Sequence, residues 1–161
     1  MSRTQRPRIT LSTLFRLLAL AAAAFSIASC QRGATPAAGD EAERLVAEGR
    51  ITYMLVCSAC HQMTGQGIPH MFPPLAQSDF LRQDKTRAIA IVLNGLSGPV
   101  KVNGERYLSV MPPQRQLSDR QIAGALSFVR SHFGNQLDAV TPEQVATVRR
   151  VGPMPVVAGN D

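Results

Sequence analysis

The sequence predicts an all-α domain of about four helices with one small β-hairpin. Apolar residues recur at helical spacing in several segments, and two of these segments begin with a capping pair. Strand-like alternation is confined to a short stretch around an Asn-Gly turn. The 161 residues suffice for one domain, and the apolar fraction of 45% is ordinary for a globular protein.

The first predicted helix covers residues 42–56 and leads directly into a cysteine. Its apolar face is formed by Ala42, Leu45, Val46, Gly49, Tyr53 and Val56. Gly49 inside a helix costs up to about 1 kcal/mol relative to alanine. This cost is easiest to understand if another helix crosses closely at that point.

In the middle of the chain, segments rich in Gly and Pro separate a short helix and a hairpin. Residues 62–80 are rich in Gly and Pro and predict a loop with fixed bends. A helix is expected from Asp84, as N-cap, to Asn94, closed by Gly95. Residues 100–107 predict the hairpin, and Met111 lies in an irregular, proline-flanked stretch.

Two capping boxes mark the last helices. Ser118 with Gln121 begins a helix that is expected to end at Gly134. Thr141 with Gln144, and a proline in the first turn, begin a second helix that runs to about residue 149.

The N-terminus predicts export. Arg3, Arg6 and Arg8 form a positive region, and an apolar run over residues 17–28 follows. This run of about a dozen residues is too short to span a bilayer comfortably, which takes about 20 residues.

Residues 27–30, Ile-Ala-Ser-Cys, resemble a bacterial lipobox, in which Cys30 is lipidated. We therefore expect a lipoprotein-type signal peptide over residues 1–29, a flexible tether over 30–40, a folded domain over 41–150 and a loose tail over 151–161. The alternative is that Cys30 is a bystander and that an ordinary signal peptidase cuts nearby. Gln31 follows the cysteine where an inner-membrane retention signal would have Asp, so the sequence permits an anchor in the outer membrane.

The charge balance argues against nucleic acid as a partner. The chain carries +6 in total, but four of its 17 Lys and Arg lie in the signal peptide, where there is no acidic residue. Residues 30–161 carry 13 basic and 11 acidic side chains, a net charge of +2. No basic stripe remains to bind phosphates.

The segment Cys57-Ser58-Ala59-Cys60-His61 predicts one covalently bound haem c. Two cysteines at this spacing can add to the two vinyl groups of a haem, and His61 is then placed to ligate the iron. A zinc site would need about four ligands, and the chain has no second cysteine pair. A thioredoxin-like redox pair would need a βαβ context, and a local structural disulfide is the simplest alternative.

Met111 is the predicted second axial ligand. It follows His61 by about fifty residues and can reach the opposite face of the haem. The other candidate ligands are less suitable: Met54 precedes the motif, and Met154 lies in the tail. Met63, His70 and Met71 follow His61 too closely to reach the opposite face. His132 is expected near the surface without a chemical role. Two filled axial positions indicate an electron carrier rather than an enzyme with an open site.

These residues together resemble class I cytochrome c over about residues 47–150. The motifs are Gly49 with Tyr53, residues 57–61, Phe72-Pro73-Pro74-Leu75, Met111-Pro112 and the helix from Ser118. The resemblance implies that the first and last helices of that fold cross near Gly49. It also implies that a proline carbonyl, that of Pro73 or else Pro74, accepts a hydrogen bond from His61.

A narrower resemblance is to the cytochrome domains of copper nitrite reductases and to the cytochrome subunits of membrane-associated dehydrogenases. It rests on residues 65–67, 72–76, 96–104 and 141–145. It implies a periplasmic electron carrier whose partner is a separate reductase, oxidase or dehydrogenase. A fixed subunit of a membrane-associated redox complex is the second hypothesis, and a haem enzyme or gas sensor with an open axial site is the third.

Overall fold

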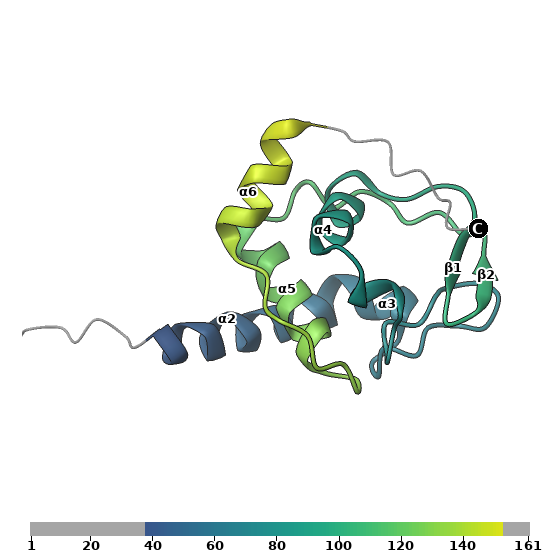
Figure 1. Ribbon diagram of the computed structural model, residues 1–161, viewed down its shortest axis with the longest axis horizontal. Helices are drawn as coiled ribbons and strands as arrows, with labels where there is room; N and C mark the ends of the chain where they lie inside the picture. The colour runs from purple at the N-terminus through teal and green to yellow at the C-terminus, as the bar shows by residue number, and fades with distance from the viewer. Residues whose placement is uncertain (1–37, 153–161) are drawn as a thin grey trace, which may run out of the picture. The chain divides into compact units, whose positions relative to one another are not determined.

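The computed structural model describes residues 38–152. They form four main helices and one two-stranded sheet (Figure 1). Within residues 38–152, no helix combines the length and the apolar character needed to cross a bilayer. The predicted signal peptide, most of the tether and most of the C-terminal tail lie outside the described residues.

The first helix, α2, spans Ala38–Thr52 and begins earlier than predicted. Residues 38–40 were predicted to belong to the tether, but they are helical. Asp40 and Glu41 lie in the first turn, where carboxylates favour the positive end of the helix dipole. The guanidinium of Arg44 also donates to the carbonyl of Asp40 over 3.3 Å. Local charge therefore extends the helix into a segment whose composition predicted a linker.

The helix does not remain regular up to the cysteine motif. A π-helical turn, Tyr53–Cys57, separates α2 from the short helix α3, Ser58–His61. Tyr53 in this turn is fully buried, and its ring lies 5.5 Å from that of Phe128 and 5.3 Å from that of Phe133. Turns of this type are uncommon and occur frequently at functional sites.

The crossing predicted at Gly49 is present, and its partner is α5, Asp119–Ser131. A Cβ atom added to Gly49 would lie 1.9 Å from the carbonyl oxygen of Gly124. The two backbones touch at a pair of glycines, so neither position accepts a side chain without moving the helices. Arg120 of α5 binds both Glu41 and Glu48 of α2, at 2.6 and 2.7 Å, and this places charge pairs beside the crossing.

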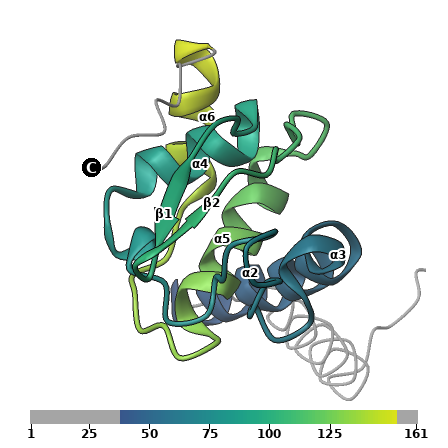
Figure 2. The ribbon, with the colours of Figure 1, turned by 90° about the vertical axis from the view of Figure 1, so that its right-hand side faces the viewer.

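The central elements agree with the sequence. Helix α4 spans Lys85–Asn94, with the carboxylate of Asp84 accepting from the amide of Thr86 at 2.8 Å and Gly95 as the C-cap. Strands β1, Val100–Val102, and β2, Glu105–Tyr107, pair antiparallel, with Val100 opposite Tyr107. The hairpin and the last helix, α6, lie at opposite sides of the domain (Figures 1 and 2).

Both predicted capping boxes are formed, at the starts of α5 and of α6, Pro142–Val151. The predicted end of α5 at Gly134 is wrong, because the helix stops at Ser131. Phe133 adopts a positive φ of 57°, and its ring joins the aromatic cluster with Tyr53 and Phe128. Tertiary packing of one aromatic ring thus ends the helix before the glycine does.

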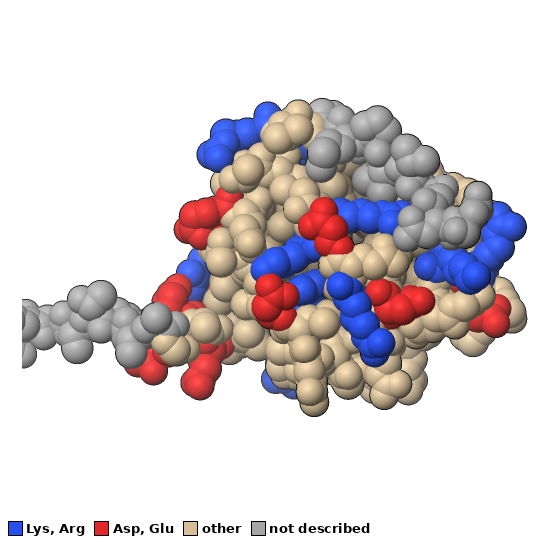
Figure 3. All heavy atoms as spheres, viewed as in Figure 1, with Lys and Arg blue, Asp and Glu red and all other residues tan. Residues whose placement is uncertain are grey.

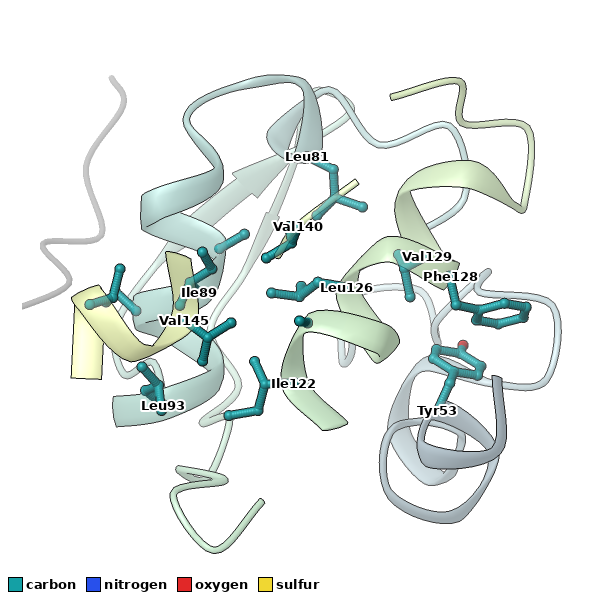
Figure 4. Packing of buried hydrophobic residues seen from close by; sticks show 14 of the residues in the cluster. Tyr53, Leu81, Ile89, Leu93, Ile122, Leu126, Phe128, Val129, Val140 and Val145 are labelled. Carbon is teal, nitrogen blue, oxygen red and sulfur yellow. The ribbon is translucent and has the colours of Figure 1, made fainter. Parts of the chain in front are cut away.

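The core lies between the helices. Figure 4 shows Ile89, Leu93, Ile122 and Val145 gathered between α4, α5 and α6, and the ring of Tyr53 beside that of Phe128. The buried guanidinium of Arg130 joins α5 to the 3-10 turn Phe80–Arg82 and to the loop before α6. It donates to the carbonyl of Leu81 at 2.6 Å and to the carboxylate of Asp138 at 2.6 Å. On the face in Figure 3, Lys and Arg side chains alternate with Asp and Glu.

Candidate haem site

A large apolar cavity lies between α3, α4, α5 and the hairpin. Its volume is about 1180 Å³, including the part that is open to solvent. Its walls come from α4, α5, the hairpin and the loops between them, and include Phe72, Leu75, Leu81, Ile91, Val92, Leu96, Val100, Val102, Leu126 and Val129. Binding sites for flat organic groups are concave and mostly apolar in this way.

His61 is fixed in one orientation at the edge of this cavity. It is the last residue of α3, and its Nδ1 lies 3.0 Å from the carbonyl oxygen of Pro73. Because a carbonyl only accepts, Nδ1 carries the proton and Nε2 is left with its lone pair. Burial lowers the pKa of His61, and the hydrogen bond to Pro73 only partly opposes this. The ring is therefore held neutral, which is the form that binds a metal ion.

The loop that carries Pro73 closes tightly on the motif. The amide of Gly67 donates to the carbonyl of His61 at 3.0 Å. Gly67 has a positive φ of 65°, and a Cβ there would lie 2.2 Å from the carbonyl oxygen of Phe72. Only glycine fits this bend. The bend brings the Pro73 carbonyl back to the imidazole.

Both cysteines of the motif line the cavity as free thiols. Burial, with a smaller contribution from the neighbouring Cys60, raises the pKa of Cys57 to about 11. Cys57 is thus a thiol at neutral pH. Two thiols and one neutral imidazole on the wall of one apolar cavity match the donor set that a covalently attached haem requires.

Met111 is held against the same cavity by its backbone. Its amide and carbonyl pair with those of Leu96, at 2.9 and 3.0 Å, as an isolated antiparallel bridge. Gly95 lies directly beneath it, where a Cβ would approach the Met111 carbonyl oxygen to 2.6 Å. Among the methionines within residues 38–152, Met111 alone lines the cavity.

The competing side chains lie elsewhere. Met63 and Met71 are more than half exposed, Met54 packs against the helical core, and His70 is exposed. His132 is also exposed, as predicted, and its ring stacks on Phe128 at 4.3 Å. Met154 and the predicted lipidation site, Cys30, lie outside the described residues.

One wall of the site, and one residue of the helix crossing outside it, were not anticipated from the sequence. The hairpin was predicted as a minor element, yet Val100, Val102 and Tyr107 form one wall of the cavity. The alternation of buried and exposed residues along β1 was the available signal. Gly124, the partner of Gly49, carries no such signal, because a glycine between apolar residues of a helix does not reveal which surface it faces.

Comparison with known protein families identifies the family to which the chain belongs. The cytochrome c family model matches residues 46–133, which include the motif, Pro73 and Met111. The chain belongs to the cytochrome c family. That family binds haem c covalently, and the two thiols, His61 and the apolar cavity fit the group.

Several named proteins resemble this cytochrome. Cytochrome c-552 of Thermus thermophilus is 40% identical over 83 residues, covering 49% of this chain and 63% of that protein. The cytochrome c subunit of alcohol dehydrogenase (quinone) from Gluconacetobacter polyoxogenes is 29% identical over 106 residues, 65% of this chain and 23% of that subunit. The fructose dehydrogenase cytochrome subunit of Gluconobacter japonicus is 32% identical over 110 residues, 65% of this chain and 22% of that subunit. The chain spans less than two thirds of the length of each.

Proposed function

We propose that this cytochrome carries single electrons outside the cytoplasm between a respiratory donor and a separate redox enzyme. His61 and Met111 would be the axial ligands of its haem c. The observation that carries the proposal is the cavity wall, on which, among residues 38–152, His61 supplies the one imidazole and Met111 the one thioether. When bound, the haem supplies a one-electron couple, and a thioether ligand raises its reduction potential relative to a second imidazole.

The chain's own contribution is to hold and orient. Thioether bonds from Cys57 and Cys60 would fix the haem against α3. The hydrogen bond from His61 to Pro73 holds the imidazole plane and its tautomer. The apolar walls would keep water from a bound haem, and burial of this kind is one of the ways in which a protein sets the reduction potential of a haem. This arrangement suits electron transfer without substrate chemistry.

The decisive experiment is the substitution Met111→Ala. The reduced wild-type protein should show a low-spin c-type spectrum and should not bind carbon monoxide. The variant should gain carbon monoxide binding and have a lower reduction potential, because one axial position is opened. Met71→Ala is the matched control, since that side chain lies off the cavity and should change neither property.

Carbon monoxide binding to the reduced wild-type protein would instead support a haem enzyme or gas sensor. If Met111→Ala alters neither the potential nor ligand binding, the axial assignment is wrong.

A second function is favoured by the dehydrogenase cytochrome subunits among the relatives. In this case the chain would be a fixed subunit of a membrane-associated complex. Purification from the native membrane distinguishes the two. A catalytic subunit that remains bound through size exclusion supports the fixed subunit, and a cytochrome that elutes alone supports the shuttle.

The proposed location is the periplasmic side of a membrane, with a lipid on Cys30. Buried acyl CH₂ groups contribute about 0.8 kcal/mol each to such anchoring. The support is the sequence of residues 1–31. The mature wild-type protein should be membrane-bound and heavier than its polypeptide and haem by the mass of the acyl chains. Cys30→Ala should release it into the soluble fraction, and a variant that remains on the membrane would contradict the anchor.

A further inference from the structure

Asn135 lies just after the end of α5, and its side chain is buried between that helix and the loop that carries Pro73. It is 5% exposed. Its Nδ2 donates to the carbonyl of Leu75 at 2.8 Å and to the carbonyl of Val129 at 2.9 Å. Its Oδ1 accepts from the amide of Ser78 at 3.2 Å. The two donor protons and the acceptor of the carboxamide are all used, as burial of an amide requires.

One of these bonds fixes the side chain to α5. The helix ends at Ser131, so its last carbonyls have no partner within the helix. The carboxamide of Asn135 satisfies the carbonyl of Val129, and the amide of Leu137 satisfies that of Arg130 at 2.9 Å. Because α5 packs against both α2 and α6, the carboxamide is attached to the part of the domain that contains the core.

The other two bonds hold the loop. Leu75 and Ser78 both line the cavity. Neither of the two prolines before Leu75 has an N–H group, so main-chain donors cannot hold that part of the loop. The carbonyl of Pro73, which accepts from His61, is only two residues before the carbonyl that accepts from Asn135. The position of the first carbonyl therefore depends on that of the second.

The remaining hydrogen bonds of this loop do less to place it against α5. The amide of Leu75 donates to the carbonyl of Gly65 at 2.7 Å, but Gly65 belongs to the same segment after the cysteine motif. The amide of Gln77 donates to the carbonyl of Phe133 at 3.1 Å, which is one bond between main chains. Asn135 adds two bonds to this one, and they are bonds that a substitution can remove.

The hydrogen bond from His61 to Pro73 affects the iron that His61 would ligate. A carbonyl that accepts from Nδ1 makes the imidazole a stronger electron donor, and stronger donation favours ferric over ferrous iron. In a loop that is free to move, this bond would be weaker on average. The reduction potential would then rise.

We propose that Asn135 is a positioning residue for His61: its carboxamide holds the carbonyl of Pro73 in place and so sets the electron-donating strength of the imidazole. The proposal rests on the proposed function, because it requires a haem that His61 ligates. Asn135 does not line the cavity itself, and it acts through the loop.

The test compares Asn135→Leu with Ser127→Ala in the full, haem-loaded chain. Leucine is similar in size to asparagine but forms no hydrogen bonds, so the loop loses two anchors without a large new cavity. Ser127 is the matched control, because it is also buried in α5 and binds a different loop. Its hydroxyl donates to the carbonyl of Val140 at 3.0 Å and accepts from the amide of that residue at 2.9 Å.

Both variants should be less stable to unfolding, but only Asn135→Leu should change the surroundings of His61. Its reduction potential should rise. The Nδ1 proton of His61, followed by NMR of the reduced protein in D₂O, should exchange about tenfold faster, since the bonds that resist local opening are lost. An unchanged potential and exchange rate in Asn135→Leu, or equal changes in Ser127→Ala, overturn the proposal.

Wild-type protein provides a measurement that does not depend on the folding of Asn135→Leu. If Asn135 holds the carbonyl of Pro73, one local opening releases both the Nδ1 proton of His61 and the amide of Ser78. Hydrogen exchange should then give similar free energies of opening for the two groups. A His61 proton that exchanges through a far easier opening than the Ser78 amide contradicts the proposal.

The absorption spectrum separates this proposal from the function on which it rests. A reduced wild-type protein without a low-spin c-type spectrum would contradict the proposed function itself. An intact spectrum in wild type and in Asn135→Leu, with unchanged exchange at His61, would leave the proposed function standing and show that the role given to Asn135 is wrong.

Discussion

The helix crossing and the cavity wall are built on different physical principles. At the crossing of α2 and α5, two glycines bring the backbones into contact and charge pairs lie beside them. The cavity wall combines the loops around Pro73 and Met111 with faces of α4, α5 and the hairpin, and residues 51–78 contain no Asp, Glu, Lys or Arg. The crossing is stabilised by contacts within the chain. The loops surround an apolar space, so their stability should depend on the group that fills it.

The largest expected effect is a difference in hydrogen-exchange protection between the two regions when the haem is not attached. In the double variant Cys57→Ser/Cys60→Ser, the amides of residues 62–78 and 95–117 should lose most of their protection from hydrogen exchange. The amides of α5 should retain a larger part of theirs. Mass spectrometry of exchange in the wild-type and variant proteins measures this. Equal loss in both regions would show that the crossing does not stand on its own.

The crossing itself is tested by Gly49→Ala. The added methyl group would collide with the Gly124 carbonyl at 1.9 Å, so the helices must separate. We expect the free energy of unfolding to fall by about 1–3 kcal/mol or more, as for overpacked cores. Gly39→Ala is the control in the same helix, because nothing lies within 4 Å of its Cβ position. It should leave stability unchanged or raise it by about 0.5–1 kcal/mol, and similar losses in both variants would contradict the crossing.

Substitution of Arg130 tests whether a buried charge outside the crossing contributes as much to stability as the Gly49 contact does. Arg130→Met removes the bonds to the Leu81 carbonyl and to Asp138 and leaves that buried carbonyl without its donor. Denaturant unfolding should show a loss of about 1–3 kcal/mol. Arg150→Met, at an exposed position of α6, should stay within about 0.5 kcal/mol of wild type. An unchanged free energy of unfolding in Arg130→Met would mean that its hydrogen bonds to Leu81 and Asp138 do not stabilise the fold.

The smallest effect is a pH dependence at Asp138. Hydrogen bonds from Lys85, and then from Arg130, lower the pKa of Asp138 to about 2. A carboxylate with a lowered pKa stabilises the fold above its unfolded value, near 3.8, and this contribution is lost as the pH falls towards 2. Because the side chain is 66% exposed, we expect less than about 1 kcal/mol.

Unfolding of wild type and Asp138→Asn between pH 2 and pH 6 measures this contribution. The difference between the two proteins should be largest above pH 4 and should shrink as the pH falls to 2. A difference that does not vary with pH would rule out the ionic contribution.

Local rules predicted much of the fold. The caps at Asp84, Ser118 and Thr141 were predictable because each depends on residues within three positions of one another. The same holds for the hairpin. The positions of His61 and Met111 on one cavity followed from the motif and from the distance along the chain. The exit of Phe133 from α5 and the pairing of Gly49 with Gly124 depend on contacts between distant segments, which local patterns do not contain.

The π-helical turn at Tyr53–Cys57 has a consequence for how one helix serves two partners. Consecutive residues of an α-helix are separated by about 100° around the axis, so eight residues on from Gly49 a side chain would be offset by about 80°. The wider turn accommodates roughly one residue more, which removes most of this offset. Cys57 accordingly packs against the core that α5 helps to form, and it also lines the cavity. Shortening the turn by one residue would swing the first attachment point away from the porphyrin while leaving the sequence of the motif intact.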